Sequence, residues 1–307
     1  MLGIYKPGKP IYSSGLYFDD MVNYSGPIVT IMDFAKQYQE VRVLSVLDDK
    51  HRFNEESHNK FDVIILFCGV HAKDPLGEDV FRQLKNITKK LIYINDDLNL
   101  YPSNLKVLSY VDEVYSYSLP VYGLDNKFHH ISPLLSAYPD YLRYRKKIVP
   151  RFKDRVITMY YSGSEGDARR FAGIKEFVLR PNVIYKLKSK TLGFDTRISK
   201  YEFDAYVEKT KYTILLADGP MYDTNFVTAR FYEYAMRGAA PIAYKEFDRN
   251  NIDTPLSVPR VSEYIELYNI IENTPESQWE HWIDEWNRYI DLKFQELTQQ
   301  IIDMVKP

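Results

Sequence analysis

Short apolar runs rich in Val, Ile and Tyr alternate along the chain with stretches in which apolar residues recur at helical spacing. Such runs are typical of buried strands and such stretches of covering helices, so the pattern predicts an α/β fold with mostly parallel sheets. Strands are expected at residues 41–46, 62–68, 90–95, 113–118, 156–162, 183–187, 212–217 and 240–244. Helices are expected at residues 26–38 and 78–87, with one long C-terminal helix from Ser277 onward.

The strand pattern occurs once in each half of the chain, which predicts two similar sheets. Between them, residues 138–155 hold two prolines and many charges, a composition that fits an interdomain linker better than a core element. We therefore expect one domain over residues 1–150 and another over residues 151–307, with the C-terminal helix packing back across the structure. The basic residues of the linker can meet DNA phosphates or form a solvated hinge; they are Arg143, Arg145, Lys146, Lys147, Arg151, Lys153 and Arg155.

Composition and charge narrow the class of protein. The chain has 307 residues, of which 45% are apolar and 27% charged, so it is globular rather than disordered or collagen-like. Its longest apolar runs, such as residues 63–67, fall far short of the roughly 20 residues that span a bilayer, and we expect no membrane partner. With a net charge of −2, the protein as a whole does not attract nucleic acid, so any such contact must come from a local group of residues. The single cysteine, Cys68, and the Lys- and Pro-containing N-terminus favour a cytoplasmic protein, which we expect to be a monomer.

Residues 160–170, YYSGSEGDARR, are the first segment that can carry chemistry. A strand turns there through Gly163 and Ser164 into a helix, and the amides at such a helix N-terminus suit a phosphate. Arg169 and Arg170 lie in the first turns and can add charge-assisted bonds to a diphosphate. The segment matches neither the P-loop nor the GxGxxG fingerprint. An ordinary capped helix is therefore the alternative interpretation.

Residues 215–248 form the second such segment, a strand followed by a polar loop with Asp218 and Tyr222 and then by a helix. Arg230 and Glu233 sit three residues apart on that helix and so share one face. A surface ion pair, worth at most about 1 kcal/mol, is the plain alternative. However, a helix that merely covers a sheet does not need Tyr, Arg and Glu near the strand ends, where α/β domains bind ligands.

Two aspartates, Asp96 and Asp97, follow directly after the strand at residues 90–95. A carboxylate at the carboxyl end of a strand can act as a general base toward a ligand bound there. Two aspartates in this position are also a common helix cap, which is the competing interpretation.

In this order, the segments resemble the T-even phage DNA β-glucosyltransferase family. The resemblance runs from about Phe61 to Asp248, and its most specific part is YDTNFVTARFYE at residues 222–233, followed after eleven residues by KEFD. It implies the GT-B architecture, in which two Rossmann-like domains face each other across a cleft. It also implies transfer of a sugar from a uridine diphosphate (UDP) donor to 5-hydroxymethylcytosine in double-stranded DNA.

The resemblance assigns roles in donor binding. Arg230 matches the arginine that grips the diphosphate, and Glu233 matches the glutamate that binds the ribose hydroxyls. Gly163 and Ser164 match the turn after a strand in this family, and Arg170 falls on its second diphosphate arginine. Asp218 and Tyr222 occupy the adjoining loop.

The resemblance also indicates the base and the uracil contacts. The family's uracil contacts come from a short loop matched by residues 196–199, which makes the backbone of Ile198 a candidate. Its catalytic aspartate falls on Asp97, within DLNL. Asp97 would take the acceptor hydroxyl proton while arginines stabilise the departing diphosphate, and a single displacement implies inversion. Reaching a base in duplex DNA implies base flipping.

One difference from the family concerns the residues that bind the diphosphate of the donor. Where the family carries another diphosphate arginine, this chain has Gly166 between Glu165 and Asp167. Either a different sugar or a divalent cation (Mg²⁺ or Mn²⁺) that offsets the acids would account for it. The six histidines include no HExxH motif or cluster with cysteine, so no zinc site is expected. UDP-glucose and UDP-arabinose both remain open as donors.

The sequence therefore predicts an inverting, UDP-sugar-dependent glycosyltransferase of phage type that modifies 5-hydroxymethylcytosine in DNA in the host cytoplasm. The first 60 residues, which hold acceptor contacts in the family, align poorly with it. Two alternatives stay open. One is a UDP-sugar-dependent glycosyltransferase acting on a glycan, lipid or protein, for which near-neutral charge is natural. The other is a non-catalytic nucleotide- or DNA-binding relative that kept the fold.

Overall fold

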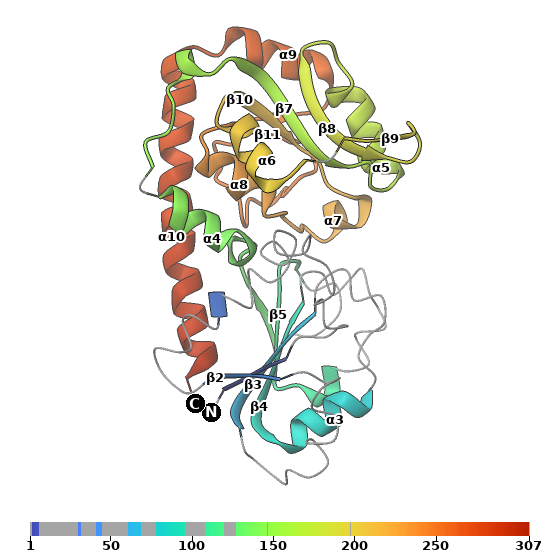
Figure 1. Ribbon diagram of the computed structural model, residues 1–307, viewed down its shortest axis with the longest axis vertical. Coiled ribbons are helices and arrows are strands. Elements are labelled where there is room, and N and C mark those ends of the chain that lie inside the picture. Colours follow the sequence, from blue (N-terminus) through green and yellow to red (C-terminus); the bar gives the residue numbers. More distant parts are fainter. Residues whose placement is uncertain are drawn as a thin grey trace. The chain divides into compact units, whose positions relative to one another are not determined.

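The computed structural model (Figure 1) describes residues 2–5, 30–31, 41–44, 61–68, 78–95, 108–119, 127–145, 147–196 and 198–306. The chain divides into two compact units, Met1–Tyr138 with Phe294–Pro307, and Pro139–Lys293. The division falls inside helix α4 (Leu134–Tyr144) rather than near residue 150. Each unit contains one six-stranded sheet, so the predicted α/β class with two sheets is confirmed.

The first unit is built on a fully parallel sheet in the order β2-β1-β3-β4-β5-β6. Its strands are β1 (Leu2–Tyr5), β2 (Val41–Leu44), β3 (Phe61–Cys68), β4 (Thr88–Asn95), β5 (Glu113–Ser116) and β6 (Phe128–His130). Consecutive residues such as Ile64 and Ile65 are fully buried, because both faces of a parallel sheet are covered. Helix α3 (Glu78–Asn86) matches the predicted helix there, whereas the one expected at 26–38 lies outside the described residues except for 30–31.

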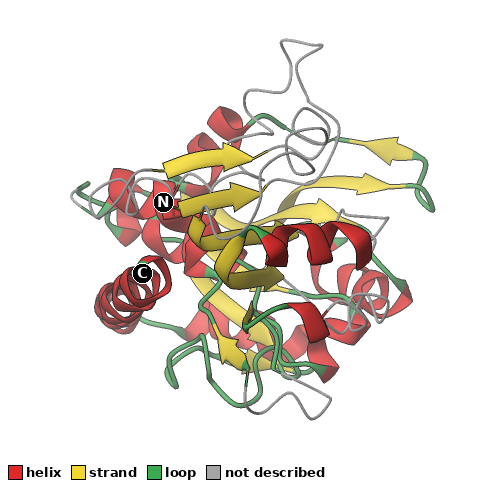
Figure 2. Cartoon of the chain, turned by 90° about the horizontal axis from the view of Figure 1, so that it is seen from below, coloured by secondary structure: helices red, strands yellow, loops and turns green. Residues whose placement is uncertain are grey.

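The second unit contains a sheet in the order β12-β11-β10-β7-β8-β9, parallel except for the β8–β9 pair. Its strands are β7 (Ile157–Ser164), β8 (Val183–Ser189), β9 (Phe194–Asp195), β10 (Thr210–Leu215), β11 (Ala240–Tyr244) and β12 (Arg260–Val261). Figure 2, coloured by secondary structure, shows helices flanking the strands. The helices of this unit are α5 (Ala168–Gly173), continued by a π-helical turn η3 (Ile174–Val178), α6 (Lys200–Val207), α7 (Gly219–Asp223), α8 (Arg230–Met236), α9 (Tyr264–Asn273) and most of α10 (Glu276–Val305).

The segment interpreted as a linker is largely ordered structure. Residues up to Tyr144 belong to α4, although Pro139 lies inside this helix. Burial of Leu134, Leu135 and Tyr141 offsets the backbone hydrogen bond that proline removes. The expectation of a linker over residues 138–155 is therefore wrong for its first part.

The basic residues of this segment mostly have internal partners. Arg155 is 2% exposed and donates to the carbonyl oxygens of Pro150, Val207, Thr210 and Arg237, and burial lowers its pKa to about 10. Arg155 is therefore a structural residue and not a contact for DNA or a solvated hinge. Arg143 pairs with Asp204 and Lys147 with Glu208, and Lys146 lies outside the described residues.

The long C-terminal helix is confirmed and runs over Glu276–Val305 as α10. In the second unit, Trp279 Nε1 donates to the Lys211 carbonyl and Trp286 Nε1 to Ser257 Oγ. The last residues of α10 belong to the first unit, where Gln300 Nε2 donates to the His130 carbonyl. Among the residues that the structure describes, no helix combines the length and apolar character needed to cross a bilayer.

Candidate functional site

The predicted site residues of the second unit gather where its strands end. Strands β7 and β10 are parallel neighbours, ending at Ser164 and Leu215, and each is followed by a loop and a short helix. Because parallel strands place their carboxyl ends at the same edge, the two loops meet there. Gly163, Ser164 and Arg170 come to this edge from β7 and α5, while Asp218 and Tyr222 come from the loop after β10 and from α7.

Two aspartates tie these loops together. Asp167 caps α5, its Oδ1 accepting from the backbone N–H groups of Arg169 (3.0 Å) and Arg170 (2.9 Å). Its Oδ2 accepts from Gly219 N at 2.7 Å, and Asp218 Oδ1 accepts from Asp167 N at 2.9 Å. We expected the N-terminal amides of α5 to be free for a phosphate, but two of them donate to the capping Asp167. This favours the capped-helix interpretation.

Gly166 is required by the shape of this turn. Its φ angle is +64°, and a Cβ atom on it would lie 2.1 Å from Asp218 Oδ1 and 2.5 Å from Arg170 Cδ. An arginine, which the resemblance expects here, does not fit this space. The departure from the family therefore has a local steric cause.

The acids that flank Gly166 also have partners. Glu165 accepts from Ser189 Oγ at 2.6 Å and from Thr191 N at 3.0 Å, and these hydrogen bonds lower its pKa. Asp167 forms the cap described above. Within the part of the chain that the structure describes, no group of three or more His, Cys, Asp or Glu side chains is arranged to hold a metal ion. Glu165 and Asp167 are thus engaged in hydrogen bonds within the protein.

The two arginines of α5 differ in their surroundings. Arg169 pairs with Glu246 and, at 3.3 Å, with Asp223, and its guanidinium lies over the Tyr222 ring. Arg170 is only 14% exposed at its side chain, with Nε 3.3 Å from Asp218 Oδ1 and Nη1 3.5 Å from Ser164 Oγ. Arg169 is thus held by carboxylates, and Arg170 reaches back toward the end of β7.

Two of the predicted residues take mainly structural contacts. Tyr222 is 2% exposed, its hydroxyl accepts from Ala217 N at 2.9 Å, and burial raises its pKa. Asp218 bonds to the loop of Asp167 and to Arg170. Both residues shape the loop after β10.

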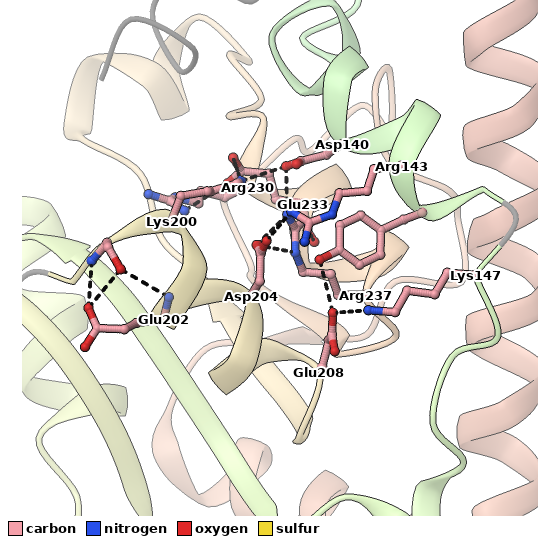
Figure 3. Close-up of polar contacts among 12 residues, drawn as sticks. Asp140, Arg143, Lys147, Lys200, Glu202, Asp204, Glu208, Arg230, Glu233 and Arg237 are labelled. Carbon is pink, nitrogen blue, oxygen red and sulfur yellow. Dashed lines mark hydrogen bonds and ion pairs between the residues drawn. The ribbon is translucent and has the colours of Figure 1, made fainter. Parts of the chain in front are cut away.

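Helix α8 carries the charged pair predicted from its three-residue spacing. Arg230 Nη1 lies 2.9 Å from Glu233 Oε2, and the two side chains are 44% and 15% exposed. Lys200 Nζ approaches the other carboxylate oxygen, Oε1, at 3.4 Å (Figure 3). Burial alone would raise the pKa of Glu233, but the positive charges of Arg230, Lys200 and Arg237 outweigh it and lower that pKa to about 2. Glu233 is therefore ionised, and the pair is more than an exposed ion pair.

Further charges, which the sequence analysis missed, surround Glu233. Lys200 Nζ lies 2.7 Å from Asp140 Oδ2, which in turn lies 2.9 Å from Arg237 Nη2. Arg237 Nη1 donates to the backbone carbonyl of Glu233 at 2.7 Å, and its Nη2 pairs with Asp204 at 2.7 Å (Figure 3). Glu233 follows Arg230 by three residues, and Arg237 follows Glu233 by four. This spacing along one helix face could have indicated Arg237. No spacing rule connects Asp140 or Lys200 to them.

The ends of β7 and α8 are linked as well. Ser162 N donates to the Tyr234 hydroxyl at 3.2 Å. Burial raises the pKa of Tyr161 to about 12, and the nearby charges of Arg170 and Arg230 oppose this rise.

Two residues of the loop expected to contact uracil, Thr196 and Ser199, form defined hydrogen bonds. Thr196 N donates to the Leu187 carbonyl at 2.9 Å, and Ser199 begins α6 with a reciprocal capping box to Glu202. Asp97, two positions after Asn95 in the sequence, lies outside the described residues, and its role as base stays a prediction.

The two parallel sheets with covering helices and a long terminal helix define the GT-B glycosyltransferase fold. The protein is similar to T4 phage β-glucosyltransferase bound to UDP-glucose, with a TM-score of 0.65 and 12% identity over 100% of this chain and 99% of that one. The T4 enzyme bound to UDP and Mn²⁺ matches with a TM-score of 0.64 and 11% identity over the same shares. Anabaena HepE bound to UDP-glucose matches with a TM-score of 0.52 and 11% identity over 99% and 98%. No family model and no curated protein sequence matches the chain.

Replacing Gly166 by Ala should lower the free energy of unfolding by roughly 3 kcal/mol, because the new Cβ meets both a disfavoured φ and two side-chain atoms. Gly193→Ala is the matched control, since Gly193 has a φ of +70° with nothing within 4 Å of its added Cβ, and should cost about 1 kcal/mol. Urea unfolding of both variants measures the difference. Equal losses would contradict the steric role of Gly166.

The low pKa of Glu233 predicts a pH dependence. A carboxyl whose pKa falls from 4.5 to about 2 on folding contributes stability that is present above its unfolded pKa and lost as the pH falls toward 2. The difference in unfolding free energy between the wild type and Glu233→Gln should therefore shrink steadily below about pH 4.5. Denaturant unfolding at a series of pH values checks this, and a constant difference would contradict it.

Proposed function

We propose that the protein is an inverting glycosyltransferase that transfers a sugar from a UDP donor to 5-hydroxymethylcytosine in double-stranded DNA. The observation that carries the donor half of this proposal is the pairing of the exposed Arg230 with Glu233 on α8. Arg170, whose Nη1 lies 3.5 Å from Ser164 Oγ at the end of β7, is proposed to act with this pair. The proposal is supported by the GT-B fold, which the chain shares with proteins whose structures contain UDP-glucose.

Each donor residue has a physical task. The guanidinium groups of Arg170 and Arg230 offset the negative charge of the diphosphate and stabilise the charge that grows on it as it leaves. Arg230, 44% exposed, is accessible to such a ligand. Glu233, held ionised, accepts hydrogen bonds from the ribose hydroxyls. The backbone of Ile198 offers hydrogen bonds to the uracil edge.

The acceptor half of the proposal rests on the family resemblance and on Asp97. Asp97 accepts the proton of the hydroxymethyl group, whose oxygen attacks the anomeric carbon while the bond to the diphosphate breaks. Attack on the side opposite the leaving group inverts the anomeric carbon. The cytosine has to leave the duplex to react, at a cost of a few kcal/mol that pocket contacts offset.

Replacing Arg230 by Ala should weaken binding of UDP by roughly 10- to 150-fold, the usual worth of a hydrogen bond to a charged group. Isothermal titration calorimetry with UDP measures this. Arg288→Ala, which removes an arginine of α10, is the control and should keep the wild-type affinity. An Arg230→Ala protein that binds UDP as tightly as the wild type would remove Arg230 from the donor site.

Incubation with UDP-glucose or UDP-arabinose should add the mass of one sugar to the nucleoside of hydroxymethylated DNA and leave unmodified DNA unchanged. Asp97→Asn should slow this transfer by about 10²- to 10⁴-fold with UDP binding intact. Asp96→Asn, the neighbouring aspartate, is the control and should transfer normally. A rate above about a tenth of wild type in Asp97→Asn would exclude Asp97 as the base. Transfer only to glycan, lipid or protein acceptors would exclude the DNA substrate.

A further inference from the structure

The carboxylate of Glu233 has two cationic partners of different character. Arg230 Nη1 lies 2.9 Å from Oε2, and Lys200 Nζ lies 3.4 Å from Oε1. The Arg230 side chain is 44% exposed, whereas that of Lys200 is 21% exposed. Arg230 is thus the more accessible of the two partners of Glu233, and Lys200 is the more buried.

Lys200 is placed by Asp140 more than by Glu233. Its ammonium lies 2.7 Å from Asp140 Oδ2, a shorter distance than the 3.4 Å to Glu233. Asp140 is fixed in turn by Arg237, which also donates to the backbone carbonyl of Glu233. The contacts close a ring that starts at the carboxylate of Glu233 and returns to its main chain. The carboxylate and the main-chain carbonyl of Glu233 are therefore held by the same network of charged residues.

In the proposed donor site, this ring of contacts would keep a cation beside Glu233 when the diphosphate binds. When Arg230 binds a diphosphate, it shares its charge with that anion, and Glu233 loses part of its counter-charge. A carboxylate that is only 15% exposed is costly to keep ionised without a cation nearby. Lys200 remains in place because Asp140 anchors it.

We propose that Lys200 is a positioning residue that keeps Glu233 charged and directed at the ribose hydroxyls while Arg230 engages the diphosphate. This inference rests on the proposed function. Its consequence is a specificity effect: Lys200 sustains the preference for a ribonucleotide over a 2′-deoxyribonucleotide donor. Lys200 itself need not touch the nucleotide.

The test compares the affinities of UDP and 2′-deoxy-UDP by calorimetry. The wild type should prefer UDP by at least about tenfold, as expected for a hydroxyl bonded to a charged carboxylate. Lys200→Met should reduce this preference to roughly threefold or less, and Lys200→Arg, which keeps the charge, should restore most of it. A merely structural role for Lys200 would weaken both nucleotides equally and leave the ratio unchanged.

Lys147→Met is the matched control, because it removes a lysine that pairs with Glu208 outside the ring, and it should keep the wild-type ratio. Asp140→Asn provides a second variant with nearly unchanged shape; by releasing Lys200 it should lower the ratio in the same direction. An unchanged ratio in Lys200→Met or in Asp140→Asn would overturn the inference while the proposed function stands. A wild type that does not bind UDP would overturn both.

Discussion

The burial of Arg237 is the constraint on which the arrangement around Glu233 depends. Its side chain has no exposed surface, so its charge must be met inside the protein. Asp204 of α6 and Asp140 of α4 supply the carboxylates, and removing one partner from such a buried set costs about 3–5 kcal/mol. Helices α4, α6 and α8 are therefore held together by one guanidinium. Its remaining donor group fixes the main chain at Glu233.

The edge formed by β7 and β10 is stabilised differently, through aspartates bonded to backbone amides. Asp167 and Asp218 each bond to the backbone of the other's loop or of the helix that follows it, which orders the turn at Gly166. Arg230, with 44% of its side chain exposed, is more accessible to a ligand than Arg170, with 14%.

Sequence pattern predicted most strands because both sheets are parallel apart from the β8–β9 pair, so that a strand such as β11 is a continuous apolar run. The short strands β1, β6, β9 and β12 were not predicted. The pair Arg230 and Glu233 was found because its partners are close in sequence on one helix. Helix α4 was missed because Pro139 argues against a helix unless tertiary packing overrides it. Asp140 and Lys200 were missed for another reason: they are distant in sequence, and only the fold brings them to Glu233.

The acidic turn around Gly166 is ordered by local contacts within the protein. An acidic turn in place of an arginine suggested a metal ion or a different sugar, because unpaired acids beside a diphosphate would repel it. The structure accounts for each acid by a hydrogen bond to a backbone amide or a hydroxyl, and the turn has no room for a side chain at Gly166. With that arginine absent, the proposed donor site has fewer cations to meet the diphosphate. Each remaining arginine then matters more, and so does a lysine that leaves Arg230 free to serve the diphosphate.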